Sequence, residues 1–258
     1  MASNLLDMKE STLFVASGNE QLKQKALTLA KKIKLPFAGN LELLKQQKKN
    51  FSGSSFLVVS ENLIYLKKQL SGTSQPIFCD FLKWSKESKK SNLIKTMRGL
   101  PKPSVIIDAT AGLGKDALVL SSLVEKLILI EIVPWVSVLL EDGIKNSRDS
   151  LPDLMHTHVI CSNAKKFLLG LKFKPEAIYL DPMFENTGKS KAKREVQALR
   201  DLTVQTDEEE LFKVALKKAK DRVVVKRHKK AKNLGGIKPT FSLKGRVVRY
   251  DVYSLKLS

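Results

Sequence analysis

Short apolar runs alternate with amphipathic segments along the second half of the chain. The runs are SVIIDA (104–109), KLILIEI (126–132), HTHVICS (156–162), AIYLDP (177–182) and RVVVKR (222–227), with more strand-like sequence at 244–257. Helices are predicted at KDALVLSSLV (115–124) and from Pro134 onward, since proline is favoured in the first helical turn. Apolar strands of this length, separated by helices, predict a parallel sheet covered on both faces.

The first part of the chain has a different pattern. Its apolar runs are TLFVAS (12–17), SSFLVVS (54–60) and PIFCDF (76–81). The segment from Glu20 to Leu35 has apolar residues at three- and four-residue spacing, which predicts an amphipathic helix. A basic connector at 81–103 follows. We therefore predict a small N-terminal α+β domain with a basic linker (residues 1–90) and a Rossmann-like domain (residues 91–258).

The composition indicates the size of the core and the cellular location to expect. The chain has 258 residues, 43% of them apolar, which is enough for a substantial core. Its two cysteines, Cys79 and Cys161, cannot supply a disulfide framework or a zinc site, so we expect a reducing cytoplasmic location and no metal. We find no apolar run of about 18 residues and no signal-peptide pattern, so no membrane association is expected.

The charge favours a polyanionic partner. Lys and Arg outnumber Asp and Glu by 46 to 26, which gives a formal net charge of +20 and a pI near 9.8. Such an excess attracts nucleic acid through its long-range field. A generally lysine-rich composition with no specific partner is the alternative.

The loop DATAGLGKD, which follows the first strand of the second region, indicates a ligand site. A phosphate-binding P-loop needs Gly and Ser/Thr where this chain has Ala109 and Asp116. A dinucleotide fingerprint needs a third glycine after Gly112 and Gly114. S-adenosylmethionine (SAM) instead carries a sulfonium and an ammonium group, which the acids of the loop, including Asp108, would attract. The loop therefore favours SAM over a nucleotide.

Two later strand ends extend this prediction. Glu131 stands 23 positions after Asp108, where an acid meets ribose hydroxyls in a doubly wound sheet. Ser162 and Asn163 close the next strand and are placed to bond the adenine edge. The alternative for Glu131 is an acid that only precedes a helix.

The motif IYLDPMF indicates the chemistry. The Asp181 carboxylate and the Pro182 carbonyl could accept hydrogen bonds from an exocyclic amine, whose lone pair is otherwise delocalised into a base ring. Phe184 could stack on a base taken out of its helix. The motif therefore predicts amine methylation, with an ordinary strand-to-loop turn as the alternative.

The motifs together resemble one bacterial family. DATAGLGKDALVL, VSVLLEDGI, IYLDPMFENTGKSKAKREVQALRDL and RVVVKRH are similar to the ribosomal RNA small subunit methyltransferase J family. The resemblance implies a Rossmann-like class I SAM-dependent methyltransferase sheet, and methyl transfer from SAM to the N2 amine of one guanosine in 16S ribosomal RNA. It also implies that SAM contacts lie at Lys115 with Asp116, Glu131 with Ile132, Ser162 with Asn163, and Asp181. Residues 1–75 match the family only weakly.

Departures from the general amine-methylating pattern are small. Met183 replaces a second proline, and Thr110 replaces a further glycine of the loop. The cofactor site predicted from the loop, the strand ends and the resemblance together comprises Asp108, Thr110, Gly112, Gly114, Lys115, Asp116, Glu131, Ile132, Ser162, Asn163 and Asp181.

Two basic segments are predicted to bind RNA phosphates. The residues are Lys189, Lys191, Lys193 and Arg194 after the catalytic motif, and Lys226, Arg227 and His228 at the end of the fifth strand. The expected partner is 16S ribosomal RNA or the small ribosomal subunit. Two alternatives remain open: methylation of another nucleic-acid amine, such as adenine in DNA or RNA, and a non-catalytic RNA-binding assembly factor.

Overall fold

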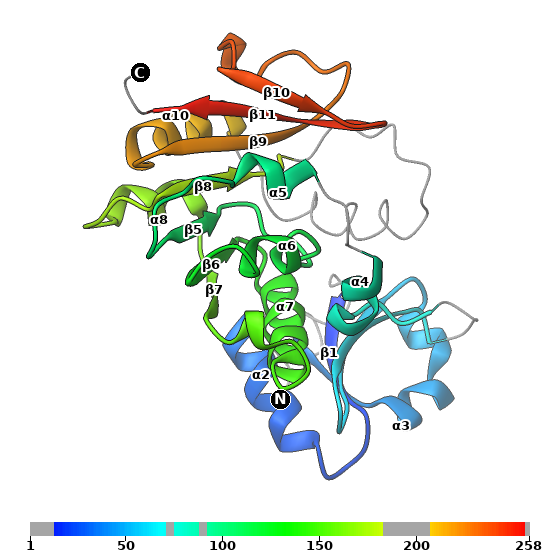
Figure 1. Cartoon of the computed structure of the whole chain (residues 1–258). Helices are drawn as coiled ribbons and strands as arrows, with labels where there is room; N and C mark the ends of the chain where they lie inside the picture. The colour runs from blue at the N-terminus through cyan, green and yellow to red at the C-terminus, as the bar shows by residue number, and fades with distance from the viewer. Residues whose placement is uncertain (1–12, 71–74, 88–91, 183–206, 256–258) are drawn as a thin grey trace. The chain divides into compact units, whose positions relative to one another are not determined.

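The computed structural model describes residues 13–70, 75–87, 92–182 and 207–255 (Figure 1). The chain divides into two compact units. The first is Met1–Asp80 with Val138–Asn146, and the second is Phe81–Ser137 with Ser147–Ser258. The domain boundary near residue 90 stays a prediction. Within the described ranges, no helix is long and apolar enough to span a membrane.

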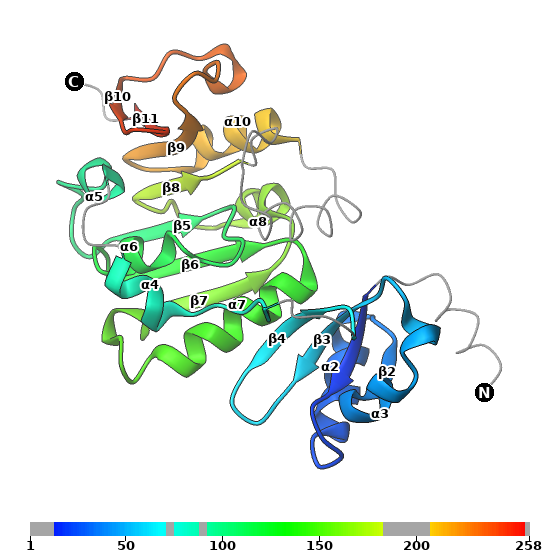
Figure 2. The same cartoon turned by 90° about the vertical axis from the view of Figure 1, so that its right-hand side faces the viewer.

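The first unit contains a four-stranded sheet (Figure 2). Its elements are β1 (Leu13–Ser17), α2 (Lys23–Ile33), β2 (Phe37–Asn40), α3 (Leu41–Gln46), a 3-10 turn (Lys48–Phe51), β3 (Ser55–Val59) and β4 (Ile64–Lys68). The strand order is β2-β1-β3-β4, with only β4 antiparallel to its neighbour. Phe14, Phe51 and Phe56 form an aromatic cluster with ring centroids 5.3 to 5.9 Å apart. These contacts give the small sheet a core of its own.

The amphipathic helix predicted at 20–35 is confirmed with tighter bounds. It is α2, which buries Ala26, Ala30 and Ile33. The helix ends at Lys34, whose φ of 57° places it in the left-handed region and whose N–H bonds back to the last turn.

A seven-stranded sheet dominates the second unit. Its helices are α4 (Phe81–Glu87), α5 (Asn92–Thr96), α6 (Ala117–Ser121), α8 (Ala164–Gly170) and α10 (Glu208–Lys218), with 3-10 turns at Pro152–Leu154 and Leu234–Gly236. Helix α7 (Pro134–Ser147) starts in this unit, and its residues Val138–Asn146 are grouped with the first unit. Its strands are β5 (Val105–Asp108), β6 (Lys126–Glu131), β7 (Thr157–Cys161), β8 (Ala177–Leu180), β9 (Arg222–His228), β10 (Phe241–Lys244) and β11 (Val248–Ser254). The strand order is β10-β11-β9-β8-β5-β6-β7, parallel from β9 to β7 and antiparallel at β11 and β10.

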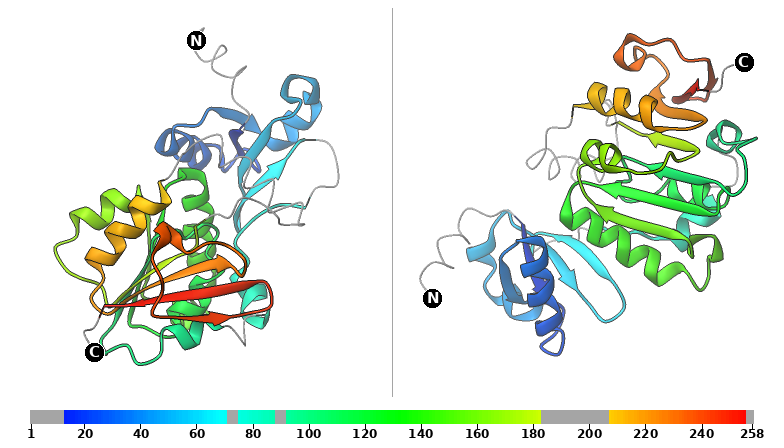
Figure 3. Two further views of the ribbon diagram at one scale, coloured as in Figure 1. Left: turned by 90° about the horizontal axis from the view of Figure 1, so that it is seen from above. Right: turned by 90° about the vertical axis from the view of Figure 1, so that its left-hand side faces the viewer.

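Helices cover both faces of the parallel strands (Figure 3). On one face, Ile107, Ile128 and Ile178 pack with Leu168 of α8 and Phe212 of α10. The alternate residues of the same strands are also buried, as in a sheet sandwiched between helices. The predicted α/β fold and its five parallel strands are confirmed.

Some local predictions were incomplete. The helix expected at 115–124 is shorter, because it ends at Ser121. The hydroxyls of Ser121 and Ser122 bond back to carbonyls three residues earlier, which competes with helix extension. β10 was not predicted, since FSLK is short and half polar.

The predicted basic connector contains two short helices, α4 and α5. Their apolar residues are used in packing. Phe81 is fully buried, with the Trp84 ring 5.4 Å from its own, and Leu93 of α5 is fully buried as well. The lysines between these residues concealed an apolar pattern that fixes the segment to the second unit.

Candidate functional site

The candidate site lies where the strand order reverses. In chain order β5 is first, with β6 and β7 on one side of it and β8 and β9 on the other. Open α/β sheets bind ligands outside the carboxyl ends of the strands at this point. The predicted residues Asp108, Glu131, Ser162 and Asp181 stand at or just after the carboxyl ends of β5, β6, β7 and β8, so the topology gathers them at one edge.

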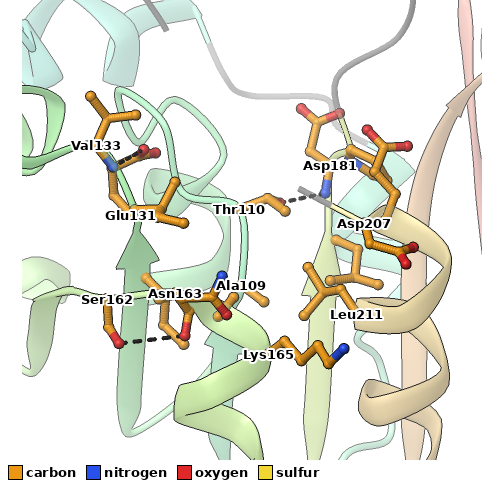
Figure 4. A pocket seen from close by; sticks show the side chains of 16 residues that line it. Ala109, Thr110, Glu131, Val133, Ser162, Asn163, Lys165, Asp181, Asp207 and Leu211 are labelled. Carbon is orange, nitrogen blue, oxygen red and sulfur yellow. Dashed lines mark hydrogen bonds between the residues drawn. The ribbon is translucent and has the colours of Figure 1, made fainter. Parts of the chain in front are cut away.

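The described residues enclose a cavity of about 290 Å³ at this edge (Figure 4). Its walls come from the ends of β5 to β8 and from the starts of α8 and α10. The lining residues are Ala109, Thr110, Ile130, Glu131, Ile132, Val133, Ser162, Asn163, Ala164, Lys165, Leu180, Asp181, Pro182, Asp207, Glu208 and Leu211. Half of these residues are apolar and half are polar or charged, so the cavity offers both apolar surface and hydrogen-bonding groups to a small molecule.

Glu131 fixes the glycine loop to the end of β6. Its Oε2 accepts a hydrogen bond from the Gly112 N–H, and its Oε1 accepts one from the Val133 N–H, both at 2.9 Å. Gly112 and Gly114 have φ values of 56° and 78°, in the left-handed region that favours glycine. The loop thus needs glycine at these positions to bring its backbone to a nearly fully buried carboxylate.

A second chain of hydrogen bonds ties β5 to β8. The Asp108 Oδ1 accepts from the Thr110 N–H at 3.0 Å and from the Thr110 hydroxyl at 3.4 Å. The Asp181 N–H donates to Thr110 Oγ1 at 2.6 Å. Thr110 therefore fixes the backbone at Asp181, the predicted catalytic residue.

Asp108 is an unusual carboxyl group. Burial raises its pKa to about 8, and the charges of Asp116 and Asp181 act in the same direction. The backbone hydrogen bond from Thr110 and the charge of Lys226 oppose this shift. Asp108 consequently binds a proton at neutral pH, and its role at this edge is structural support for the loop.

Lys226 of β9 joins two acids of the site. Its Nζ donates to Asp116 Oδ2 at 2.7 Å and to Asp181 Oδ2 at 2.8 Å. The Tyr179 hydroxyl also donates to Asp116 Oδ2, at 2.7 Å. Burial would lower the pKa of Lys226, but the two carboxylates outweigh it and raise that pKa above the usual value for lysine. Lys226 is therefore a charged group that holds both carboxylates in place.

The far wall of the cavity is built from two helix starts. Asn163 caps α8, since its Oδ1 accepts from the Lys166 N–H at 3.0 Å. Asp207 caps α10 in the same way, through the Glu210 N–H. Lys165 bonds Glu210 at 3.2 Å and so links the two helices. These caps fix the positions of the Asn163 and Asp207 side chains at the cavity wall.

Sequence reasoning missed this wall. Val133, Lys165, Asp207, Glu208 and Leu211 line the cavity but were not predicted. The only available signal was local: Asp207 followed three residues later by Glu210, before an apolar run, marks a helix start. That signal says nothing of which cavity the helix would face.

Apart from the three predicted residues of β9, the predicted residues fall into three groups. Thr110, Glu131, Ile132, Ser162, Asn163, Asp181 and Pro182 line the cavity. Asp108, Gly112, Gly114, Lys115 and Asp116 belong to the loop that supports it but are not among its lining residues. Phe184, Lys189, Lys191, Lys193 and Arg194 lie outside the described residues.

The predicted RNA-binding residues of β9 lie at the same edge. Lys226 points toward the carboxylates, while Arg227 donates to the Lys232 carbonyl at 3.2 Å. His228 Nδ1 accepts from the Lys230 N–H at 3.4 Å. Among the described residues, no three metal-binding side chains stand close enough to hold an ion.

Comparisons with known proteins agree with the fold. The family described as "Putative SAM-dependent methyltransferase" matches residues 37–255. Ribosomal RNA small subunit methyltransferase J of Thioalkalivibrio sulfidiphilus is 33% identical over 95% of this chain and 99% of that protein. The protein of that name from Coxiella burnetii is 34% identical over 96% of this chain and 98% of its own. A crystal structure of a SAM-dependent methyltransferase from Neisseria gonorrhoeae, 24% identical, shares the fold with a TM-score of 0.69 over 94% of this chain and 96% of that chain.

Proposed function

This chain belongs to the ribosomal RNA small subunit methyltransferase J family of SAM-dependent methyltransferases, and from that premise we propose that it methylates the N2 amine of a guanosine in 16S ribosomal RNA. The resemblance that the motifs indicated is thereby confirmed at the level of the family. One observation carries the proposal: Asp181 and Pro182 line the cavity at the end of β8, with the Asp181 carboxylate held by Lys226.

The cavity fits SAM by its chemistry. The carboxylates of Glu131 and Asp181 stand in its walls and suit a ligand with cationic groups. Ile130, Leu180 and Leu211 supply apolar surface for an adenine ring. When bound, SAM supplies an electrophilic methyl group. A phosphate-bearing cofactor would instead meet these acids as like charges.

We assign the cofactor contacts by position. Glu131 lines the cavity and its two oxygens accept from backbone N–H groups. A carboxylate oxygen can accept more than one hydrogen bond, so we assign the ribose hydroxyls to Glu131. Ser162 and Asn163 border the apolar wall and would bond the adenine edge. Ile132 lines the same cavity. The loop residues Thr110, Gly112, Gly114, Lys115 and Asp116, with Asp108 beneath, shape the side that takes the methionine part.

Asp181 and Pro182 act on the substrate amine. The amine of guanine is a poor nucleophile because its lone pair is delocalised into the ring. Acceptance of its N–H hydrogen bonds by the Asp181 carboxylate and the Pro182 carbonyl returns electron density to the nitrogen and orients its lone pair. With SAM bound, the nitrogen would form its new N–C bond as the bond between the methyl carbon and the sulfonium sulfur breaks, and the sulfur would leave as a neutral thioether. The amine loses one proton, which passes to water through the carboxylate.

Lys226 is a positioning residue for this step. Its bond to Asp181 Oδ2 holds the carboxylate in one orientation, and its bond to Asp116 fixes the ammonium group from the other side. The Asp181 backbone is held separately by Thr110. Preorganised groups of this kind cost no rearrangement in the transition state.

The substrate assignment rests on the family. Stacking of the base by Phe184 and phosphate contacts from Lys189, Lys191, Lys193 and Arg194 remain predictions outside the described residues. We propose 16S ribosomal RNA or the small ribosomal subunit as partner, and therefore the cytoplasm as the place of action.

The test is methyl transfer. The protein is incubated with isotope-labelled SAM and small subunits that lack the modification, and labelled nucleosides are identified by mass spectrometry. Label in N2-methylguanosine supports the proposal. Label in another nucleoside, such as methyladenosine, keeps the enzyme and rejects its specificity. SAM-independent RNA binding without any label would favour the non-catalytic assembly factor.

A further inference from the structure

The segment from Arg222 to Tyr250 is charged with one sign. It contains ten Lys and Arg residues and no Asp or Glu, so it carries half of the net charge of +20. The ten are Arg222, Lys226, Arg227, Lys229, Lys230, Lys232, Lys238, Lys244, Arg246 and Arg249. Like charges repel each other where they come within a Debye length, which is about 8 Å at physiological ionic strength. A fold that keeps them together is suited to a polyanion.

Six of these cations are exposed. Five of them form one group, which we call the basic rim: Lys229, Lys230, Lys232, Lys244 and Arg246; the sixth is Lys238. The sheet register brings its two halves together. His228 at the end of β9 pairs with Val248 at the start of β11, and the Lys229 N–H donates to the Val247 carbonyl at 3.0 Å. Within the described ranges, no side chain of the rim forms an ion pair.

The basic rim lies at the same edge of the sheet as the cavity. β8 and β9 are parallel, and Leu180 pairs with Val225. Asp181 therefore lies beside Lys226, to which it is bonded at 2.8 Å. The rim starts only three residues further along β9. A substrate whose base reaches Asp181 thus has its neighbouring backbone next to the rim.

A buried arginine shapes the rim. Arg249 is 7% exposed and bonds both oxygens of Asp251, at 2.8 and 3.1 Å. Its Nη1 donates to the carbonyls of His228, Lys229 and Ala231 at 3.3, 3.0 and 2.8 Å, and its Nη2 donates to Asn233 Oδ1 at 3.1 Å. The carbonyls of the turn are thus directed inward to one guanidinium. The backbone that carries the three lysines is fixed before any partner binds.

We propose that the basic rim, held by Arg249, is the surface on which the RNA backbone docks next to the catalytic cavity. The inference rests on the proposed function and adds to it the place of substrate binding. RNA is favoured over an acidic protein because the rim is a short series of exposed cations on a rigid turn beside a cavity that acts on a base, and RNA brings closely spaced phosphates with such a base. Arg249 contacts no RNA and acts only by positioning the turn.

The direct test replaces charge and keeps size. In the full chain, Lys229, Lys230 and Lys232 are changed together to Gln, and binding to 16S ribosomal RNA is titrated at several salt concentrations. We expect affinity to fall by about tenfold to a hundredfold, and the slope of log Kd against log salt to decrease by about 2. SAM affinity and melting temperature stay at the wild-type values, because the turn backbone is untouched.

The matched control removes the same charge from the opposite edge of the sheet. Lys126, Lys172 and Lys174 are exposed and stand near the amino ends of β6 and β8. Their triple change to Gln should leave the RNA affinity within about twofold of wild type. Equal losses in the two triple variants would mean that only net charge matters, and would overturn the proposal. An unchanged affinity of the Lys229, Lys230 and Lys232 variant would overturn it as well.

Arg249→Lys tests the positioning role separately. It keeps the charge but loses the fork that reaches three carbonyls and Asn233. We expect weaker RNA binding with an unchanged SAM affinity in the folded variant, whose melting temperature is measured alongside. RNA binding equal to wild type would remove Arg249 from the account. All these readouts are binding measurements, so they stand even if methyl transfer to guanosine fails, and that failure would reject the proposed function alone.

Discussion

The ligand-binding edge of the large sheet has two halves of opposite charge. At the ends of β5, β6 and β8 the conspicuous charged groups are the carboxylates of Asp116, Glu131 and Asp181, beside the buried carboxyl of Asp108, whose pKa is raised to about 8. From β9 onward there are ten cations and no acid until Asp251. One residue lies at the boundary, since Lys226 comes from the basic strand but bonds two of the acids.

The difference matches the two ligands of a methyl transfer to RNA. A donor with cationic groups is attracted by the acid half, while a polyanion is attracted by the basic half and repelled by the acids. Each ligand therefore finds a half with complementary charge and is disfavoured by the other. The reacting base and the methyl group would meet at the boundary, beside Asp181.

Among changes to the acid half, Asp181→Ala should cause the largest loss of activity. It removes the acceptor for the amine N–H, so we expect kcat to fall by about a hundredfold to a thousandfold. The measurement is steady-state methyl transfer to small subunits. Binding of 16S ribosomal RNA to the basic half should persist. A kcat within a few-fold of wild type would exclude Asp181 from the chemistry.

Replacement of Lys226, the residue at the boundary, should have the next largest effect on kcat. Lys226→Met keeps the length of the side chain but leaves Asp116 and Asp181 without their shared cation, so Asp181 loses its fixed orientation. We expect kcat to fall by about tenfold to a hundredfold, with little change in the KM for RNA. Lys226→Arg should restore part of the rate.

The comparison variant for Lys226→Met is Lys229→Gln, three residues along the same strand end. It removes the same charge but belongs to the basic rim, so it should raise the KM for RNA and leave kcat nearly unchanged. If Lys226→Met and Lys229→Gln both altered kcat, or both altered the KM for RNA, the boundary between the acid half and the basic half would not lie between these two residues.

The burial of Asp108 should make the free energy of unfolding depend on pH. The pKa of Asp108 is raised to about 8 by burial, so between the usual carboxyl range and pH 8 the folded protein holds a proton that the unfolded chain releases. The free energy of unfolding of the wild type should therefore decrease as pH rises through this window, relative to Asp108→Asn, by about 1.4 kcal/mol per pH unit. Above pH 8 the difference should become constant. The free energy of unfolding of both SAM-free proteins is measured by urea unfolding at several pH values. If it changed with pH equally in the wild type and in Asp108→Asn, the raised pKa of Asp108 would be contradicted.

The smallest expected effect concerns the cofactor. Glu131→Gln places an NH2 group opposite a backbone N–H of Gly112 or Val133, which leaves a buried donor unsatisfied. SAM affinity, measured by calorimetry, should fall about tenfold, with RNA affinity unchanged. Glu125→Gln, an exposed acid just before the amino end of β6, is the matched control. A loss of SAM affinity in both variants alike would refute a specific role for Glu131.

The residues of the acid half could be predicted from the sequence, because the topology of the sheet alone brings most of them together. Buried apolar runs determine the parallel strands, and the residues at their carboxyl ends must meet at one edge. Asp108, Glu131 and Asp181 follow from that rule alone. Lys165, Asp207 and Leu211 do not, because the packing of α8 against α10 decides which helix residues reach the cavity.

The basic half was only partly readable. Its net charge can be counted in the sequence, but the sequence does not show which cations bond groups inside the protein and which are exposed. Lys226 stands in a run of cations and looks like a phosphate contact, yet its partners are acids 110 and 45 positions earlier in the chain. Arg249 is one more arginine of a basic strand until the fold directs it to carbonyls of a turn some 20 positions earlier.

The central claim is that the two ligands bind separate halves of one edge. The most direct measurement is the salt dependence of both KM values of the wild-type enzyme, in one series from about 50 mM to about 300 mM monovalent salt. The KM for RNA should rise steeply, because phosphate contacts of the exposed rim release counterions. The KM for SAM should stay nearly constant, because the Glu131 carboxylate is buried in the cavity wall and Asp181 is only partly exposed. A parallel rise of both constants would contradict the account.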